Sequence, residues 1–219
     1  IKVFTGEQTA VGTVMTDKDD NQIWAFYPGA MRRASQLSII AGSRPGLELV
    51  MIAPNDPGAV VKYVDECVRH KIDFMYDPAG NIPRYTRAQL KQGVEGAKFV
   101  IGNDYEMQLI NNQLPNNQLR KEQIRITTLG AKGAMIEQNG KTYKIPAAKV
   151  GKVVDPTGAG DAFRAGFLAG YVKGLPLEVC GRMGSVCAAY TVEKYGTQTH
   201  KFTLAEFKKR SRENFGDIL

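Results

Sequence analysis

Residues 155–163 (DPTGAGDAF) have the residue types and spacing best suited to chemistry in this chain. Gly158 and Gly160 stand where a helix is expected to begin, and glycines there let an anion approach the backbone N–H groups. Asp161 falls in the first turn, where an ionised carboxylate can accept a proton from a hydroxyl that attacks a phosphoryl group. The segment therefore indicates phosphoryl transfer, although a glycine-rich turn with an aspartate cap would have the same spacing.

Three other well-known motifs do not fit the sequence. A P-loop requires GxxxxGK[ST]; residues 140–142 (GKT) match its end, but Met135 stands where the first glycine is needed. The dinucleotide motif GxGxxG fails because Phe163 takes the place of the third glycine. A GxSxG nucleophile elbow does not occur. These absences leave the 155–163 segment as the main candidate.

Alternating strands and helices are predicted from about residue 47 onward. Short apolar runs predict strands at 47–54, 72–76, 98–101 and 124–129. Helices are predicted around 60–68, at 87–96, after Asn103, and at about 159–173, 176–194 and 203–215. This order predicts an α/β fold with a mostly parallel sheet covered on both faces. Sites in such folds lie in the loops that lead from strands into helices. The stretch 152–154 before Asp155 also has the composition of a strand.

Two hairpins are predicted as well. The first joins strands at 9–16 and 22–27 through a turn at 17–21, and the second joins 134–137 to 142–145 around Asn139-Gly140. The chain opens directly on the first hairpin and has no initiator methionine. We therefore expect that an N-terminal portion is missing.

Composition excludes several classes of protein. The 219 residues include 43% hydrophobic and 23% charged residues, ordinary values for a globular chain that can bury a core. The sequence lacks the run of about 18–20 apolar residues that a membrane span needs, and no signal peptide is expected. Three cysteines without metal-type spacing predict reduced thiols and a cytoplasmic location. The net charge of +7 comes from scattered residues, so a nucleic-acid partner is not expected.

Residues 155–163 resemble the second signature of the ribokinase-like (PfkB) carbohydrate kinase family. Three further segments match motifs of that family in the same order. Residues 103–106 match its N-x-x-E motif, and residues 128–133 resemble its T-L-G-x-x-G segment beside the nucleotide phosphates. Residues 188–197 resemble the helix and loop that border adenine and a monovalent cation.

Finer features of residues 26–31, 102–106 and 155–164 are more similar to bacterial adenosine or broad-specificity nucleoside kinases than to ribokinase. The resemblance implies a three-layer α/β/α fold with a partial β-hairpin lid. Residues 1–30 would be part of the lid on the acceptor side, and residues 31–219 would be the nucleotide-binding and catalytic domain. Family members normally begin with a Gly-Gly signature and an acceptor-binding Asp that this chain lacks, so much of the acceptor pocket would be absent.

The resemblance also implies roles in catalysis. Asp161 would be the base for the acceptor hydroxyl, and the N–H groups of Gly158, Ala159 and Gly160 would form the anion hole for the transferred phosphoryl group. Arg164, one turn further along, would reach a phosphate or lie exposed on the surface.

Cofactor-binding residues follow from the same resemblance. Residues that would contact ATP are Asn103, Thr128, Gly130, Gly133 and, as apolar surface beside adenine, Cys187. Glu106, with Asn103, would hold the water shell of Mg²⁺. Asp155 and Thr157, with carbonyls near Gly196, would hold K⁺. The plainer alternatives are a helix cap for Asn103, a turn carboxylate for Asp155 and helix packing for Cys187.

The predicted function is ATP- and Mg²⁺-dependent phosphorylation of the 5′-hydroxyl of a nucleoside, with adenosine first among the acceptors. The alternatives are a sugar kinase that acts on ribose or a related furanose, and an ATP-binding fragment without catalysis. The predicted state is a monomer or a homodimer.

Overall fold

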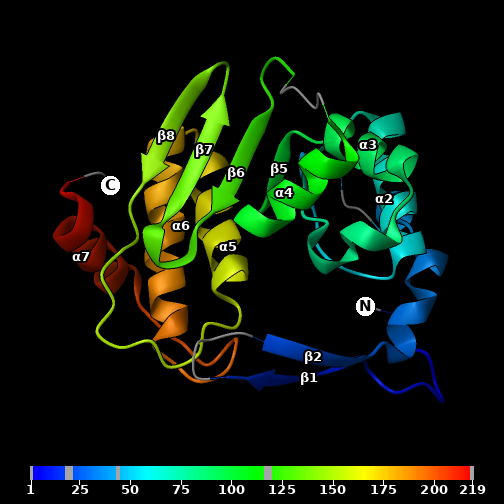
Figure 1. The fold of residues 1–219 in the computed structure, drawn as a ribbon, viewed down its shortest axis with the longest axis horizontal. Helices are drawn as coiled ribbons and strands as arrows, with labels where there is room; N and C mark the ends of the chain where they lie inside the picture. The colour runs from blue at the N-terminus through cyan, green and yellow to red at the C-terminus, as the bar shows by residue number, and fades with distance from the viewer. Residues whose placement is uncertain (1, 18–21, 43–44, 116–119, 218–219) are drawn as a thin grey trace. The chain divides into compact units, whose positions relative to one another are not determined.

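A computed structural model of the chain describes residues 2–17, 22–42, 45–115 and 120–217 (Figure 1). The chain divides into two compact units, Ile1–Arg120 and Lys121–Leu219. Each unit has its own strands and helices, and every contact described below lies within one of them.

The first unit contains three parallel strands, β3 (Leu49–Ile52), β4 (Asp73–Tyr76) and β5 (Phe99–Asn103). Its longer helices are α2 (Pro57–His70), α3 (Arg87–Gly96) and α4 (Asp104–Gln113). Its short helical segments are η1 (Gly29–Gln36), α1 (Ile39–Gly42) and η2 (Ala79–Arg84). The predicted strands and longer helices are confirmed to within a few residues, whereas the short helical segments were not predicted.

Local sequence explains where the helices of the first unit begin and which face they bury. The side chain of Asp56 caps α2 by accepting a hydrogen bond from the N–H of Ala59, and Pro57 occupies the first helical position. Buried side chains from α2, α3 and α4 form one apolar cluster with β3, β4 and β5. Gly93 lets α3 approach closely, since a Cβ there would lie 2.6 Å from the ring of Tyr76. The predicted pattern of strand followed by helix thus builds this core.

The predicted N-terminal hairpin is present as β1 (Val11–Thr16) and β2 (Gln22–Tyr27), which pair in antiparallel register with Val11 opposite Tyr27. Of its expected turn at 17–21, residues 18–21 lie outside the described residues. Gly29 follows β2 with φ +46°, and a Cβ there would lie 2.2 Å from the carbonyl oxygen of Gln8. Only glycine fits this close approach at the base of the hairpin.

The second unit contains three antiparallel strands, β6 (Ile124–Thr128), β7 (Ala134–Gln138) and β8 (Lys141–Ile145). Asn139 and Gly140 join β7 to β8 with φ of 51° and 73°. Left-handed values at both positions are what a two-residue hairpin turn requires, so the predicted hairpin is confirmed. Parallel pairing therefore describes β3 to β5 of the first unit, whereas the hairpin of β1 and β2 and the strands of the second unit pair antiparallel.

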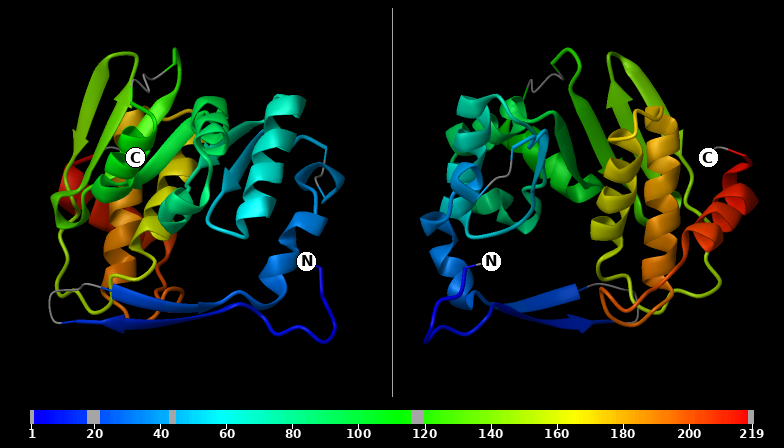
Figure 2. Two further views of the ribbon diagram at one scale, coloured as in Figure 1. Left: turned by 45° about the vertical axis from the view of Figure 1, so that its right-hand side comes forward. Right: turned by 180° about the vertical axis from the view of Figure 1, so that it is seen from behind.

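Helices α5 (Ala159–Tyr171), α6 (Leu177–Val192) and α7 (Leu204–Phe215) complete the second unit (Figure 2). Helices α5 and α6 lie side by side, and α6 packs on β7 and β8. Phe207 of α7 joins an apolar cluster with Met183 and Val186 of α6. Within the described part of the chain, no helix has both the length and the hydropathy to cross a membrane.

The strand-like character predicted for residues 152–154 is wrong, because the structure shows irregular backbone there. Its β-branched residues favour a strand, but Val154 donates its N–H to the carbonyl of Val192, at the end of α6, rather than to a strand. The side chains of Val153 and Val154 are about half exposed. The segment before Asp155 is thus held by a helix end.

The close packing of α5 on α6 gives a first prediction. A Cβ at Gly166 would lie 2.8 Å from the sulfur of Cys187 and 2.8 Å from the carbonyl oxygen of Met183. We expect Gly166→Ala to lower the free energy of unfolding by about 1–3 kcal/mol, because the helices must move apart. Gly80→Ala, where a Cβ would meet no atom within 4 Å, should change it by less than about 0.5 kcal/mol. Urea denaturation of both variants provides the measurement, and equal stability would contradict the tight contact.

Candidate active site

Helix α5 begins at a glycine, without the side-chain cap that most of the other helices have. Gly158 is the N-cap with φ 87° and makes no side-chain hydrogen bond to the first turn. The first N–H groups of a helix have no acceptor within it and carry the positive end of the helix dipole. A Cβ on Gly160 would meet no atom within 4 Å, which leaves room for a ligand beside the backbone. The N–H of Ala159 already donates to the carbonyl of Pro156 at 3.2 Å.

Asp161 stands in the first turn of α5 and forms an ion pair with Arg164, one turn further along. The Asp161 side chain is 72% exposed, whereas that of Arg164 is 10% exposed. Desolvation raises the pKa of the Asp161 carboxyl above 3.8, and the guanidinium and the helix dipole act in the opposite direction. Burial lowers the pKa of Arg164 to about 10, so this side chain remains charged at neutral pH. Arg164 is therefore a buried partner of Asp161, and the expected alternative of an exposed surface position is wrong.

Asp155 joins the loop before α5 to the loop after α6. One carboxylate oxygen accepts from the N–H of Thr157 and the other from the N–H of Gly196, each at 2.9 Å. The Thr157 hydroxyl and these N–H groups hold the pKa of Asp155 below its usual value of 3.8. Next to this contact, a Cβ on Gly158 would lie 3.2 Å from the Cβ of Thr197. The residues expected around K⁺ thus lie together, and Asp155 also fills its alternative role as a turn carboxylate.

Residues 128–133 form a tight turn between β6 and β7. Leu129 donates its N–H to the carbonyl of Gly133 at 2.8 Å, and a short 3₁₀ helix, η3 (Gly130–Lys132), lies between them. Gly130 and Gly133 both have left-handed φ, of 56° and 94°. A Cβ on Gly133 would lie 2.0 Å from the carbonyl oxygen of Ile145, so this position requires glycine. Thr128 ends β6 directly before the turn.

Asn103 and Glu106 belong to the first unit, at the start of α4. The Asn103 side chain accepts from the N–H of Glu106, and the Glu106 carboxylate accepts from the N–H of Asn103, both at 2.8 Å. This capping box fulfils the helix-cap alternative for Asn103 and fixes the orientation of the Glu106 carboxylate. A Cβ on Gly102 would lie 3.1 Å from that carboxylate, so glycine makes room for it.

An oriented carboxylate fits Mg²⁺, which usually keeps several waters and takes few protein ligands. Clusters of three or more His, Cys, Asp or Glu residues that could hold a metal ion directly are absent from the described ranges. Contact through water, as expected for Glu106, is the arrangement that these residues fit.

Cys187 lies on α6 with its sulfur toward α5, where a Cβ on Gly166 would lie 2.8 Å from it. Burial raises the pKa of its thiol to about 11. Helix packing, the plainer alternative, thus accounts for this contact. A hollow of about 510 Å³ opens nearby on the second unit, between α6, α7 and residue 149. Its lining residues are Lys149, Tyr190, Glu206, Lys209, Arg210, Glu213 and Asn214, which include none of the predicted site residues.

Two ion pairs near the site were not predicted from the sequence. Arg164 lies three residues after Asp161 on the same helix, a spacing at which side chains meet, so this ion pair could have been predicted from the sequence. The ion pair of Arg210 with Glu193 joins residues 17 positions apart on different segments, and no local spacing indicates it.

Comparison with known proteins identifies the family. Residues 1–203 match the pfkB family of carbohydrate kinases, and the chain belongs to this family. It is 36% identical to a nucleoside kinase of Methanocaldococcus jannaschii over 89% of the chain, and it spans 64% of the length of that relative. Two solved structures of a Burkholderia thailandensis nucleoside kinase, in complex with inosine and with ADP-inosine, are also similar. They have TM-scores of 0.89, identities of 33% and 32%, and coverage of 96% of this chain and 70% and 66% of theirs.

These similarities confirm the predicted family and the ribokinase-like α/β fold. The roles of individual residues and the functional division at residue 30 stay predictions.

The hydrogen bonds of Asp155 give a prediction about stability and pH. Folding lowers the pKa of this carboxyl. Its contribution to the free energy of unfolding is therefore complete at pH values above its pKa in the unfolded chain, and it is lost as the pH falls through its pKa in the folded protein. Asp155→Asn removes the charge and places an amide donor among N–H groups. We expect the variant to be less stable than the wild type above about pH 5 and the difference to shrink toward about pH 3. Urea denaturation across this range provides the measurement, and a difference that does not change with pH would contradict it.

Proposed function

We propose that the protein is an ATP- and Mg²⁺-dependent kinase that phosphorylates the 5′-hydroxyl of a nucleoside, with adenosine as the preferred acceptor. The observation that carries this proposal is the position of Asp161, in the first turn of α5 directly after the glycine-opened, uncapped start of the helix at Gly158 to Gly160. The names of the relatives support a nucleoside as the class of acceptor. Adenosine rests on the sequence features shared with adenosine kinases.

In the proposed reaction, the Asp161 carboxylate accepts the proton of the 5′-hydroxyl as its oxygen attacks the γ-phosphorus of ATP. The bond from that oxygen to phosphorus forms, the bond to the ADP oxygen breaks, and the proton later leaves Asp161 for solvent. N–H groups at Gly158, Ala159 and Gly160 would stabilise the charge that develops on the transferred group. Binding there would require the Ala159 N–H to exchange its contact with Pro156 for the phosphoryl oxygen. Arg164 would hold the carboxylate in place through the ion pair.

The remaining predicted residues would bind the cofactors. Thr128, Gly130 and Gly133 would line the phosphates, and Asn103 and Glu106 would orient the water shell of Mg²⁺. When bound, Mg²⁺ would neutralise part of the phosphate charge.

The proposal gives roles to three further parts of the chain. Asp155 and Thr157 would contribute to a K⁺ site, since they lie against Gly196. Cys187 would border adenine only with the part of its side chain that α5 leaves uncovered. Residues 1–30 would act as part of a lid on the acceptor side.

The cell compartment and the oligomeric state belong to the proposal as well. The three cysteines are free, which supports a reducing, cytoplasmic location. We propose a monomer or a homodimer. Size-exclusion chromatography with light scattering would distinguish the two by the molar mass of the protein.

A sugar kinase is the second candidate, because the family is one of carbohydrate kinases. ADP release should be measured with Mg²⁺ and K⁺ against adenosine, inosine, guanosine, ribose and fructose. The assay should use the product of the full open reading frame, with the 219-residue chain in parallel. We expect the fastest turnover on adenosine; turnover only on a free sugar would favour the second candidate. Bound ATP without turnover by either protein would mean an ATP-binding module without catalysis.

Replacement of the proposed base gives the sharpest test. We expect Asp161→Asn to reduce kcat by roughly 10²–10⁴-fold, since the amide cannot accept the proton, while ATP affinity changes little. Steady-state kinetics and calorimetric ATP titration measure the two effects. Asp65→Asn is the matched control, because Asp65 also pairs with an arginine along its own helix, at 2.5 Å from Arg69, but lies on α2. Near-normal turnover in Asp161→Asn would show that the base is misassigned.

A further inference from the structure

Residues 146–157 lead from β8 to the anion site without forming a strand or helix. Their backbone groups are bound instead by α6, by the residues after α6 and by α7. Ser185 of α6 accepts from the N–H of Ala148 at 2.7 Å and donates to the carbonyl of Pro146 at 3.1 Å. Asn214 of α7 accepts from the N–H of Lys149 at 2.6 Å.

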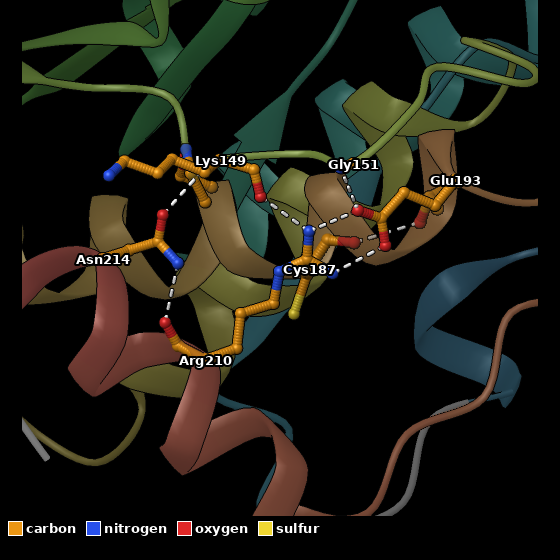
Figure 3. Close-up of polar contacts among 9 residues, drawn as sticks. Lys149, Gly151, Cys187, Glu193, Arg210 and Asn214 are labelled. Atoms are coloured by element: carbon orange, nitrogen blue, oxygen red, sulfur yellow. Dashed lines mark hydrogen bonds and ion pairs between the residues drawn. The ribbon is translucent and has the colours of Figure 1, made fainter.

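Arg210 and Glu193 form the centre of this network (Figure 3). The guanidinium of Arg210, on α7, donates to both carboxylate oxygens of Glu193, at 2.8 and 2.6 Å, and to the carbonyl of Lys149 at 2.7 Å. The guanidinium also lies 4.5 Å from the ring centroid of Tyr190. The same Glu193 carboxylate accepts from the N–H of Gly151 at 2.9 Å. The side chains are 14% and 25% exposed, so solvent screens this bidentate pair less than it would a surface pair.

Glu193 also belongs to the short segment that holds Asp155. The preceding residue, Val192, accepts from the N–H groups of Val154 and Asp155 at 2.7 and 3.2 Å. Three residues after Glu193, Gly196 donates to the Asp155 carboxylate. Residues 192–196 therefore bind Arg210 on one side and the loop that opens α5 on the other.

We propose that Arg210 and Glu193 are positioning residues that, from α7, hold residues 149–155 and thereby pre-order the phosphate-binding loop at Gly158 to Gly160. This inference rests on the proposed function only in naming the ligand of that loop as the phosphates of ATP. A loop that is already ordered loses less conformational freedom when it binds a ligand. Loosening the network should therefore weaken ATP binding, although neither side chain touches the nucleotide.

The test uses Arg210→Met and Glu193→Gln in the product of the full open reading frame, with Mg·ATP as the titrated ligand. Calorimetry should give a Kd for Mg·ATP that is roughly tenfold higher in each variant, and the KM for ATP should rise more than kcat falls. Amide hydrogen exchange should speed up within 149–157 and stay as in the wild type in β6 to β8. Arg210→Lys keeps the charge but cannot make all three contacts, so it should recover part of the affinity.

The matched control is Arg182→Met. Arg182 also pairs with a glutamate, Glu178, at 2.5 Å and lies 5.8 Å from an aromatic ring centroid, that of Phe215, within the same unit. Among the described residues, Arg182 has no hydrogen bond or ion pair with residues 146–157, so the Kd of Arg182→Met for Mg·ATP should stay within about twofold of the wild-type value.

Unchanged ATP affinity in Arg210→Met and Glu193→Gln would overturn the proposal, as would an equal loss in Arg182→Met. If Arg210→Met does not fold, Glu193→Gln and Arg210→Lys decide in its place. If the wild type binds ATP without turnover, the proposed kinase activity fails, but the Kd values still test the positioning role.

Discussion

The loop that opens α5 depends on one carboxylate, that of Asp155. By accepting an N–H from Thr157 and another from Gly196, it closes the turn before α5 and fixes that turn to the loop after α6. Gly158 then starts α5 with a left-handed φ against Thr197. The packing of α5 on α6 at Gly166 sets the direction of the helix, and the Asp155 contact fixes the loop that leads into its first turn. Asp161 and Arg164 are placed by the two together.

The N-termini of the helices differ in how their first N–H groups are satisfied, and the difference falls at the proposed anion site. Side chains of Asp56, Thr86, Asn103 and Thr203 cap α2, α3, α4 and α7. Helix α5 has no such side-chain contact, and glycine is its N-cap. Helix α6 is also without one, but it begins after Pro176 and carries Glu178 in its first turn. An uncapped, glycine-opened terminus leaves N–H groups that an anion could bind, at a cost in stability on the order of a few tenths of a kcal/mol relative to a good cap.

Much of the fold could be predicted from local sequence because local chemistry determines it. Helix α3 begins at the Thr86 and Gln89 capping box, and the turn at Asn139-Gly140 uses the two residues that best adopt left-handed φ. The 152–154 stretch was mispredicted because its valines have strand propensity, whereas its hydrogen-bond partner is the end of a helix distant in sequence. The motif residues of the candidate site were predicted from resemblance. The contact of Arg210 with Glu193 could not be predicted from the sequence, because it forms only when α7 packs beside the end of α6.

The cysteines have a practical consequence. Cys67 lies buried in α2 of the first unit and Cys180 is buried in α6 of the second, and burial raises the pKa of each thiol to about 11. Thiols in this state react slowly with alkylating reagents, because the thiolate is the reactive form. Each becomes reactive only when its helix opens. The rates at which the two thiols are alkylated under native conditions therefore report separately on local opening in the two halves of the chain, with no introduced label.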